Sequence, residues 1–365
     1  MIDQQKVERA AERFQLPEGS FERLTLRRDS KRRDQRIRAG VLGLAIAIAV
    51  GWLGVNAIRS TPPVPAPADE GGTVAPPPVG IFSEVGGWIA FQGGGALRAI
   101  APDGSDETVL LDTREPLAQD WSPDGSRLLV TRWGERLSVI EPDGSETTLV
   151  RFDEATYFDV DASFSPDGST VVYTIGPSAE NGPSQMWTVA SDGSEKPRLV
   201  VESDQSLGPG GDQGFTWLYE PTYSPDGTQI AYVDGWGDST HSLRVVNTDG
   251  TDVRVLFDAT TPPFDEAGHV DGVEWSPDGS LIAISGDLYG IYTVRPDGTD
   301  LRLLIPEGVS FAWSPDGSRI AYSKTDLQHI YWGVWVASAD GSNPRMISAT
   351  GQVGPWNPGG PADRT

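Results

Sequence analysis

The sequence Trp121-Ser122-Pro123-Asp124-Gly125 is one copy of a five-residue phrase that recurs along the chain. Near copies that begin with Phe, Tyr or Trp lie at residues 164–168, 223–227, 275–279 and 313–317, and a degenerate copy lies at 356–360. Their prolines are 43, 59, 52, 38 and 43 residues apart. A recurrence of roughly 40 residues is typical of proteins built from structural repeats.

Each copy has the composition of a tight turn between two strands. The leading aromatic residue ends one strand, Pro presets φ at the first corner, and Gly accepts the positive φ that follows. An apolar run such as Leu128-Leu129-Val130 then begins the next strand. A second turn with Asp-Gly, such as Asp143-Gly144, follows in every repeat. Each repeat therefore predicts two hairpins, which make four antiparallel strands.

Four-stranded repeats of this length are the blades of a β-propeller. The first blade is incomplete, because the apolar run 88–91 reads as a second strand with no turn phrase before it. The missing first strand is the one that ends at the degenerate copy near Trp356. We therefore predict an all-β fold, a six-bladed β-propeller over residues 84–360, followed by a short tail at 361–365. The C-terminal strand closes the split first blade, which removes the exposed edges of an open stack.

Composition and charge exclude several classes of function. The 365 residues contain no cysteine, which rules out disulfides, thiol catalysis and cysteine-bound zinc. Residues 1–39 carry 11 basic and 7 acidic side chains, whereas residues 60–365 carry 16 basic and 45 acidic ones. An acidic body of this kind repels phosphate, so we expect no binding of nucleic acid.

The N-terminal 83 residues have the composition of a membrane tether. Residues 1–39 form a short basic segment, and residues 40–58 are uncharged and mostly apolar over a length that spans a bilayer as one helix. The basic side chains before this helix place the N-terminus in the cytoplasm. Residues 59–83 are rich in proline and predict a semi-rigid linker.

A cleaved signal peptide is the alternative interpretation of residues 1–58. The basic region is far longer than in signal peptides, and no Ala-x-Ala pattern directly follows the apolar run. We therefore favour an uncleaved signal anchor, which would leave the propeller outside the cytoplasm at the cell membrane. The basic cluster is explained by its role in setting the membrane topology and by its attraction to lipid head groups. A docking site for a cytoplasmic partner is the more specific alternative.

The repeat Trp-Ser-Pro-Asp-Gly-Ser-x-Ile-Ala-Tyr, followed by Asp-Gly, resembles the TolB-type β-propeller repeat of bacterial envelope proteins. The resemblance covers roughly residues 84–360 and implies a six-bladed propeller outside the cytoplasm that serves as a platform for protein binding. The N-terminal domain of TolB is absent here, which argues against a free, secreted role. The order of tail, anchor, linker and propeller is similar to that of actinobacterial membrane proteins.

The connections between strands predict where a ligand binds. The two short turns of each blade emerge on one face, and the second-to-third and blade-to-blade connections emerge on the other, which we name the long-connection face. The long insertions fall in this second group, at residues 151–161, 176–184, 203–220, 234–241, 257–271 and 323–331. Long loops on a rigid scaffold often carry binding sites.

Aromatic, acidic and histidine side chains in these insertions are the candidate binding residues. They are Trp217, Tyr219, Glu220, Trp236, Asp238, His241, His269 and Asp271. Trp and Tyr anchor protein interfaces at low entropic cost. Packing between neighbouring blades is the alternative role for Trp217 and Tyr219.

The sequence contains no recognisable catalytic or metal-binding motif. It has no Gly-x-Ser-x-Gly elbow, and its three histidines fall in different blades. Asp159-x-Asp161 begins like an EF-hand loop, but Phe164 stands where that loop needs glycine. We therefore expect no catalytic residues, no metal site and no cofactor, with a structural calcium ion among the Asp-rich turns as the open alternative.

Together these features predict a single-pass membrane protein that displays a non-enzymatic binding propeller at the cell envelope, with a protein or glycan as its partner. A sensor that relays to a cytoplasmic regulator through residues 1–39 is one alternative. A propeller enzyme, a lyase or hydrolase acting on polysaccharide or peptide, is the other, and the lack of a catalytic cluster disfavours it.

Overall fold

The computed structural model of the chain describes residues 87–93, 96–111, 117–132, 135–152, 160–176, 183–203, 216–236, 240–257, 270–286, 290–325, 331–349 and 351–358. The predicted tail, membrane anchor and linker at residues 1–83 lie outside these ranges. Within the ranges there is no helix with the length and hydropathy that a membrane span requires.

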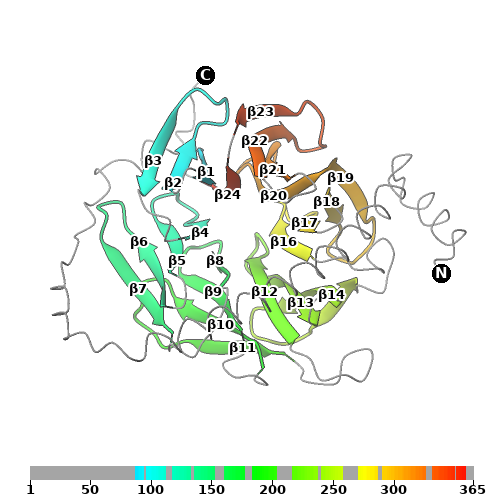
Figure 1. Cartoon of the computed structure of the whole chain (residues 1–365). Coiled ribbons are helices and arrows are strands. Elements are labelled where there is room, and N and C mark those ends of the chain that lie inside the picture. The colour runs from blue at the N-terminus through cyan, green and yellow to red at the C-terminus, as the bar shows by residue number, and fades with distance from the viewer. Residues whose placement is uncertain are drawn as a thin grey trace, which may run out of the picture. The chain divides into compact units, whose positions relative to one another are not determined.

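The described residues form six four-stranded antiparallel sheets, arranged around a ring (Figure 1). Blade 1 consists of β24 (Gln352–Trp356), β1 (Ile89–Gly93), β2 (Ala96–Ile100) and β3 (Glu107–Leu111). Blade 2 consists of β4 (Leu117–Trp121), β5 (Leu128–Arg132), β6 (Arg136–Ile140) and β7 (Glu146–Arg151). Blade 3 consists of β8 (Ala162–Phe164), β9 (Thr170–Ile175), β10 (Gln185–Ala190) and β11 (Arg198–Glu202).

The other three blades follow the same order. Blade 4 consists of β12 (Thr216–Tyr223), β13 (Gln229–Trp236), β14 (Thr240–Asn247) and β15 (Arg254–Phe257). Blade 5 consists of β16 (Val270–Trp275), β17 (Ile282–Gly286), β18 (Gly290–Val294) and β19 (Arg302–Pro306). Blade 6 consists of β20 (Gly308–Trp313), β21 (Arg319–Thr325), β22 (Tyr331–Ser338) and β23 (Arg345–Ser348). The first strand of each blade contacts the first strand of the next, which closes the ring.

The six-bladed fold and its split first blade are confirmed. The C-terminal strand β24 pairs antiparallel with β1, and Ile89 lies opposite Trp356. Hydrogen bonds extend this pairing, because the Gly87 amide donates to the Asn357 carbonyl (3.1 Å) and the Trp356 indole donates to the Gly87 carbonyl (2.7 Å). The two ends of the propeller are thus held in one sheet.

The repeated phrase forms the predicted turn in every described copy. In blade 2, Gly125 has φ of 68°, and its amide donates to the Ser122 carbonyl (2.7 Å). The carboxylate of Asp124 accepts from the Ser122 hydroxyl (2.6 Å) and the Ser126 amide (3.0 Å). In blades 3 to 6 the turn carboxylate likewise accepts from the hydroxyl of the turn serine and from the amide two residues further on. These carboxylates belong to Asp167, Asp226, Asp278 and Asp316. The Asp residues of these turns therefore serve the backbone.

The hydrophobic core consists of clusters that form between neighbouring blades. Ala283 and Ile291 of blade 5 pack with Trp313 of blade 6 in one cluster. Phe91 of blade 1 packs with Ala321 of blade 6 in another, which spans the point where the ring closes. Because each blade buries its apolar faces against its neighbours, the ring needs all six blades to complete its core.

Side chains of each blade also supply hydrogen-bond acceptors to the inner strand of the next blade. An inner strand pairs with only one neighbour, so some of its amides have no strand partner and need another acceptor. At five of the six joints in the described part, a side chain of one blade accepts from an inner-strand amide of the next. These bonds are Phe164 N to Asp120 (2.8 Å), Leu218 N to Ser184 (3.0 Å), Val270 N to His241 (3.1 Å), Trp313 N to Glu274 (3.1 Å) and Val353 N to Ser323 (2.7 Å).

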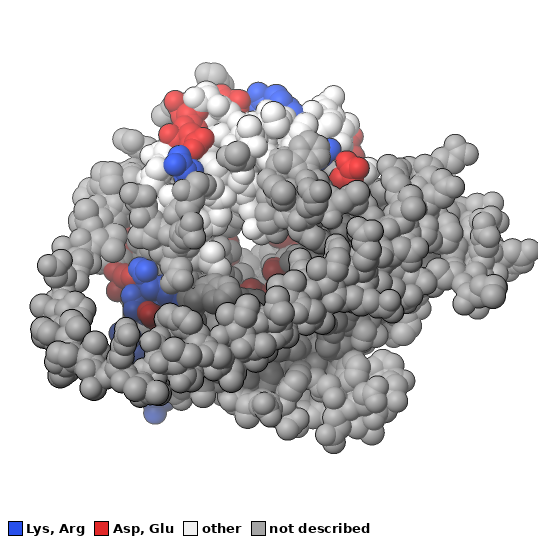
Figure 2. Space-filling model, viewed as in Figure 1, with Lys and Arg blue, Asp and Glu red and all other residues white. Residues whose placement is uncertain are grey.

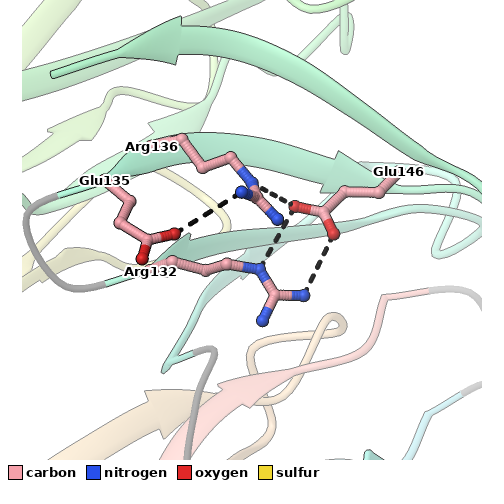
Figure 3. A network of polar contacts seen from close by, with 4 residues as sticks. All are labelled: Arg132, Glu135, Arg136 and Glu146. Carbon is pink, nitrogen blue, oxygen red and sulfur yellow. Dashed lines mark hydrogen bonds and ion pairs between the residues drawn. The ribbon is translucent and has the colours of Figure 1, made fainter. Parts of the chain in front are cut away.

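An ion-pair network ties the outer strands of blade 2 together (Figure 3). The Glu146 carboxylate accepts from the guanidinium groups of Arg132 (3.0 Å) and Arg136 (3.0 Å), and Arg136 also pairs with Glu135. Burial opposes ionisation of Glu146, but the hydrogen bonds from both arginines outweigh it and lower its pKa to about 2. The network therefore holds Glu146 in its charged form.

Replacement of Trp356 by alanine tests the closure of the ring. Trp356 is 6% exposed, and the guanidinium of Arg319 lies over its ring at 5.4 Å. We expect Trp356→Ala to lower the free energy of unfolding by about 3–5 kcal/mol, the usual cost of truncating a buried tryptophan. Denaturant unfolding measures this cost, with Met346→Ala on an exposed outer strand as the control expected to change it little. Equal stability of the two variants would contradict closure through β24.

Candidate functional site

A cavity of about 530 Å3 lies in the middle of the ring, lined by residues of all six inner strands. Figure 2 looks into the hollow at the middle of one face, where acidic side chains, in red, are visible inside it. Pro123, Pro166 and Pro225 line it as well, so it extends to the turns of the repeated phrase. Its volume falls within the range of small-molecule binding sites.

Irregular pairing of the inner strands directs polar side chains into this cavity. The pairings of β4 with β5, β12 with β13 and β20 with β21 each contain a register shift. The shifted stretches contain Gln119, Glu220 and Ser310, and all three line the cavity. Glu220 has φ of 52°, in the left-handed region that re-aims a side chain. Bulges of this type often alter the direction of a side chain near a site.

Four carboxyl groups line the cavity, and they come from four consecutive blades. They are Asp120 of blade 2, Asp161 of blade 3, Glu220 of blade 4 and Glu274 of blade 5. The described residues that line the cavity include no lysine or arginine. The opposite arc, from blades 6 and 1, presents apolar side chains: Phe311, Phe91, Leu97, Val353 and Pro355. The four carboxyl groups therefore lie on one side of the cavity, and the other side also carries the uncharged polar side chains of Gln92, Ser310 and Gln352.

Two of the carboxyl groups bind a proton more tightly than usual. Burial raises the pKa of Asp120 to about 7, against hydrogen bonds from the Phe164 and Trp121 amides. Burial also raises the pKa of Glu274 well above its ordinary value, the Trp313 amide opposes this, and the charge of Asp120 adds to it. No basic side chain contributes to either shift among the described residues. Asp120 and Glu274 are thus buried with no basic side chain among the causes of their pKa shifts.

The structure brings two of the predicted binding residues, Tyr219 and His241, together. The Tyr219 hydroxyl and His241 Nδ1 form a hydrogen bond, and the two rings meet edge to face with centroids 5.4 Å apart. His241 Nδ1 also accepts from the Val270 amide, the first residue of β16. His241 is 6% exposed, so these contacts lie inside the joint between blades 4 and 5.

Ser184 shows that the contact of His241 with Val270 is a structural one. Ser184 accepts from Leu218 at the joint between blades 3 and 4, as His241 accepts from Val270 at the next joint. Leu218 and Val270 occupy the same position in the repeat, five residues before the aromatic residue of the turn phrase. A hydroxyl in one blade and an imidazole in the next therefore accept a hydrogen bond from equivalent backbone amides.

Of the other predicted binding residues, the structure describes the side chains of Trp217 and Glu220. Trp217 is half-buried on β12, and Glu220, three residues on, lines the central cavity. Trp236 and Asp271 lie on β13 and β16, but their side chains are outside the described part of the structure. Asp238 and His269 are outside it altogether. Binding by these residues stays a prediction.

The sequence analysis missed the cavity residues Asp120, Asp161 and Glu274. A signal was present for two of them, because Asp120 and Glu274 each directly precede the aromatic residue of the turn phrase. An acid at the end of a strand beside a large apolar residue is an unusual position for a surface charge. The structure places this position at the edge of the inner strand, within reach of the next blade.

The described residues contain no group of three or more His, Asp or Glu side chains placed to hold a metal ion. Asp161, from the run that begins like an EF-hand loop, accepts from the Glu220 amide (3.1 Å). Asp159, its partner in that run, is outside the described residues. The calcium alternative thus finds no support from Asp161, whose carboxylate serves the joint between blades 3 and 4.

Substitution of His241 separates its structural role from binding. In His241→Ala the Val270 amide and the Tyr219 hydroxyl lose their shared acceptor, so we expect the free energy of unfolding to fall by about 1–3 kcal/mol. His241→Ser supplies the acceptor that blade 3 uses and should lose less. Urea unfolding of the full chain measures both, and an alanine variant as stable as the original chain would contradict the joint.

The pH dependence of stability tests the state of Asp120. Its pKa is about 7 in the fold against 3.8 for the free group, so its contribution to stability is full below pH 3.8 and is lost as the pH rises through 7. The contribution of Glu146 to stability depends on pH in the opposite direction, because its pKa is lowered to about 2 in the fold. This contribution is full above pH 4.5 and is lost as the pH falls below 4.5.

We therefore expect Asp120→Asn to flatten the decline in melting temperature between pH 4 and pH 7, as measured by thermal unfolding across a pH series. Glu146→Gln should leave that interval unchanged and alter only the acid limb below pH 4.5. An unaltered slope between pH 4 and pH 7 in Asp120→Asn would show that Asp120 ionises normally in the folded chain.

Comparisons with known proteins assign no family to the chain. No protein-family model and no curated protein matches it. Similar solved structures include an oligogalacturonate lyase in complex with manganese, with a TM-score of 0.49 and 15% identity over 70% of each chain. An oligogalacturonate lyase from Vibrio parahaemolyticus has a TM-score of 0.48 and 14% identity over 70% of this chain and 71% of that one. The Cps50 (Swd1) β-propeller domain of Myceliophteria thermophila has a TM-score of 0.47 and 14% identity over 75% and 90% of the two chains. Structural similarity at this level gives no basis for assigning an activity to this chain.

Proposed function

We propose that this chain is a membrane-tethered, non-enzymatic binding protein whose propeller stands outside the cytoplasm and takes an envelope protein or glycan on its long-connection face. The proposal rests on the difference in connection length between the two faces of the ring. The connections on one face have five to seven residues in blades 2 to 6, whereas the connections that range from one to 13 residues emerge on the opposite face.

The short-turn face is nearly identical from blade to blade. In blades 2 to 6, five or six residues join the first strand to the second, and five to seven join the third to the fourth. The turn carboxylates are already hydrogen-bonded to their own backbone, as Asp143 is to the Ser145 amide and Asp297 to the Thr299 amide. Such a surface offers little that would distinguish one partner from another.

The long-connection face differs from blade to blade. The connection from one blade to the next has a single residue between β19 and β20, but 13 residues between β11 and β12 and 12 between β15 and β16. A rigid ring whose long connections all lie on one side has the arrangement of a scaffold that carries binding loops. The two longest of these connections flank blade 4, which also carries Trp217 and Tyr219.

The membrane location rests on the sequence. Residues 40–58 have the length and apolar character of a membrane-spanning helix, with basic residues on the N-terminal side. The TolB-type resemblance of the repeats supports a place in the cell envelope. A proline-rich linker of 25 residues, 59–83, would leave the propeller close to the membrane.

Photo-crosslinking in cells tests the choice of face. A crosslinking amino acid at Asp238, between β13 and β14 on the long-connection face, should capture a partner. The same amino acid at Glu195, exposed between β10 and β11 on the short-turn face, is the matched control and should capture none. Mass spectrometry and glycan staining then identify the captured species.

The outcomes separate the proposal from its alternatives. Capture at Asp238 alone supports the binding face. Equal capture at both positions, or none at Asp238, contradicts it. Capture only by a probe at Phe14 in the N-terminal segment would favour the relay to a cytoplasmic regulator instead.

A further inference from the structure

Three arginines lie side by side across blade 2, at the end from which the long connections emerge. Arg132 ends β5, Arg136 begins β6 and Arg151 ends β7. Arg132 lies opposite Arg136, and Arg136 lies opposite Arg151. Residues directly opposite in an antiparallel pair project from the same face of the sheet. The three side chains therefore form one row, which we name the arginine row.

The arginine row costs the fold stability, because like charges in directly opposite positions repel one another. Arg132 and Arg136 share the carboxylate of Glu146, which offsets part of this repulsion (Figure 3). Arg136 also pairs with Glu135, but the Glu135 side chain is 66% exposed, and a pair of this kind adds little. Three guanidinium groups thus meet two carboxylates, and positive charge is left over. Each of the other ion pairs in the described part of the chain joins one arginine to one carboxylate.

No contact within the described residues explains Arg151. Its side chain is exposed and forms no ion pair and no hydrogen bond there. Three other arginines that lack a carboxylate partner tie neighbouring blades together. They are Arg127, which donates to the Gly168 carbonyl (2.9 Å), Arg198, which donates to the Thr248 carbonyl (2.8 Å), and Arg345, which donates to the Asp103 carbonyl (3.0 Å). The ring uses those three, whereas the guanidinium donors of Arg151 are open to a molecule outside the chain.

From the row, its incomplete compensation and the unbonded Arg151, we infer that the arginine row binds a carboxylate-bearing polysaccharide. A guanidinium group binds a carboxylate through two parallel hydrogen bonds, which fixes both position and orientation. The inference rests on the proposed function, because it names the class of glycan that the long-connection face takes.

A thin polymer suits this face better than an acidic protein does. The six long insertions carry 15 acidic residues and two basic ones, Arg151 and Lys324. A globular partner covers about 800 Å2 of this surface, so an acidic one would meet these repelling charges as well as the row. Salt at 0.15 M screens charges over about 8 Å, so a single extended chain that follows the row is acted on mainly by the arginines.

The direction of the row favours a polysaccharide over an acidic peptide. The row crosses neighbouring strands, which lie about 4.8 Å apart. A polysaccharide with a carboxylate on every sugar can present a charge at each step along the row. An extended peptide turns only every second side chain to one face, so its charges recur at about 6.6 Å.

Ligand-observed NMR on the full chain at about 0.15 M salt tests the inference with three probes. They are an oligoglucuronate of six sugars, the same oligosaccharide with its carboxyl groups reduced to alcohols, and a hexaglutamate peptide. We expect saturable binding of the oligoglucuronate, no binding of the reduced oligosaccharide, and binding of the peptide that is at least about tenfold weaker. Raising the salt should weaken the binding of the oligoglucuronate, because charge carries it.

Variants of exposed arginines locate the binding. Arg151→Gln should weaken oligoglucuronate binding about two- to fivefold, the range of an exposed ion pair, with an unchanged melting temperature. Arg151→Glu should weaken it further, because the new charge repels the ligand. Arg295→Glu makes the same change on the short-turn face, where Arg295 is 59% exposed directly after β18, and should leave binding unaltered.

Glu146→Gln separates binding from a structural role of the row. This variant removes the carboxylate that Arg132 and Arg136 share, so it should destabilise the fold and yet tighten oligoglucuronate binding about two- to fivefold. A row that only stabilised blade 2 would show the loss of stability without the tighter binding.

The results decide the inference in either direction. Equal binding of the oligoglucuronate and its reduced form, or equal weakening by Arg151→Glu and Arg295→Glu, overturns it. Binding of the hexaglutamate peptide as tight as that of the oligoglucuronate overturns the choice of a glycan. If Arg151→Glu does not fold, Arg151→Gln carries the test, and unchanged binding by that variant overturns the inference.

The inference and the proposed function fail in different ways. Capture of a protein at Asp238 in cells, together with no binding of the oligoglucuronate, would support the long-connection face and overturn the arginine row. Oligoglucuronate binding that Arg151→Glu abolishes, together with no capture at Asp238, would support the arginine row and contradict the partner expected at blade 4.

Discussion

The hydrogen bond from an inner-strand amide of one blade to a side chain of the preceding blade is the interaction on which the rest of this structure depends. A propeller blade has an inner edge that no strand covers, and its amides need acceptors. The chain supplies them from different residue types: carboxylates at Asp120 and Glu274, hydroxyls at Ser184 and Ser323, and an imidazole at His241. Asp120 and Glu274 share one position of the repeat, Ser184 and His241 share another, and Ser323 lies on the second strand of its blade, so the joints are met by different acceptors from three positions.

This constraint also shapes the cavity. Carboxyl groups that reach across a joint must sit at the inner edge, and this places Asp120 and Glu274 in the wall of the central space. Their burial without a basic partner follows from the same geometry, since the neighbouring groups are backbone amides and apolar side chains. The ring therefore acquires part of its acidic arc as a by-product of closing its joints, and Glu220 also belongs to that arc.

The repeats were sufficient to predict the number of blades, the split first blade and the two turns of each repeat, because proline, glycine and aromatic positions report local backbone geometry directly. The joints could not be predicted in the same way. His241 stood out as a loop histidine, but its partner Val270 lies in another blade, and only the folded ring brings the two together. Glu220 was selected for the long-connection face, and the structure shows that it lines the central cavity, at a register shift in β12 that the sequence does not reveal. The functions predicted for residues 1–58 and for Asp238 and His269 fall outside the described residues and stay predictions.

Hydrogen exchange in the native state tests the central claim that the joints make the six blades one cooperative unit. The inner-strand amides of Phe164, Trp313 and Val353 lie at three different joints. If the joints close one ring, these amides exchange only through global unfolding, with the same free energy and the same denaturant dependence. Separate exchange energies that rise or fall from blade to blade would show that the blades open individually, and would contradict this account.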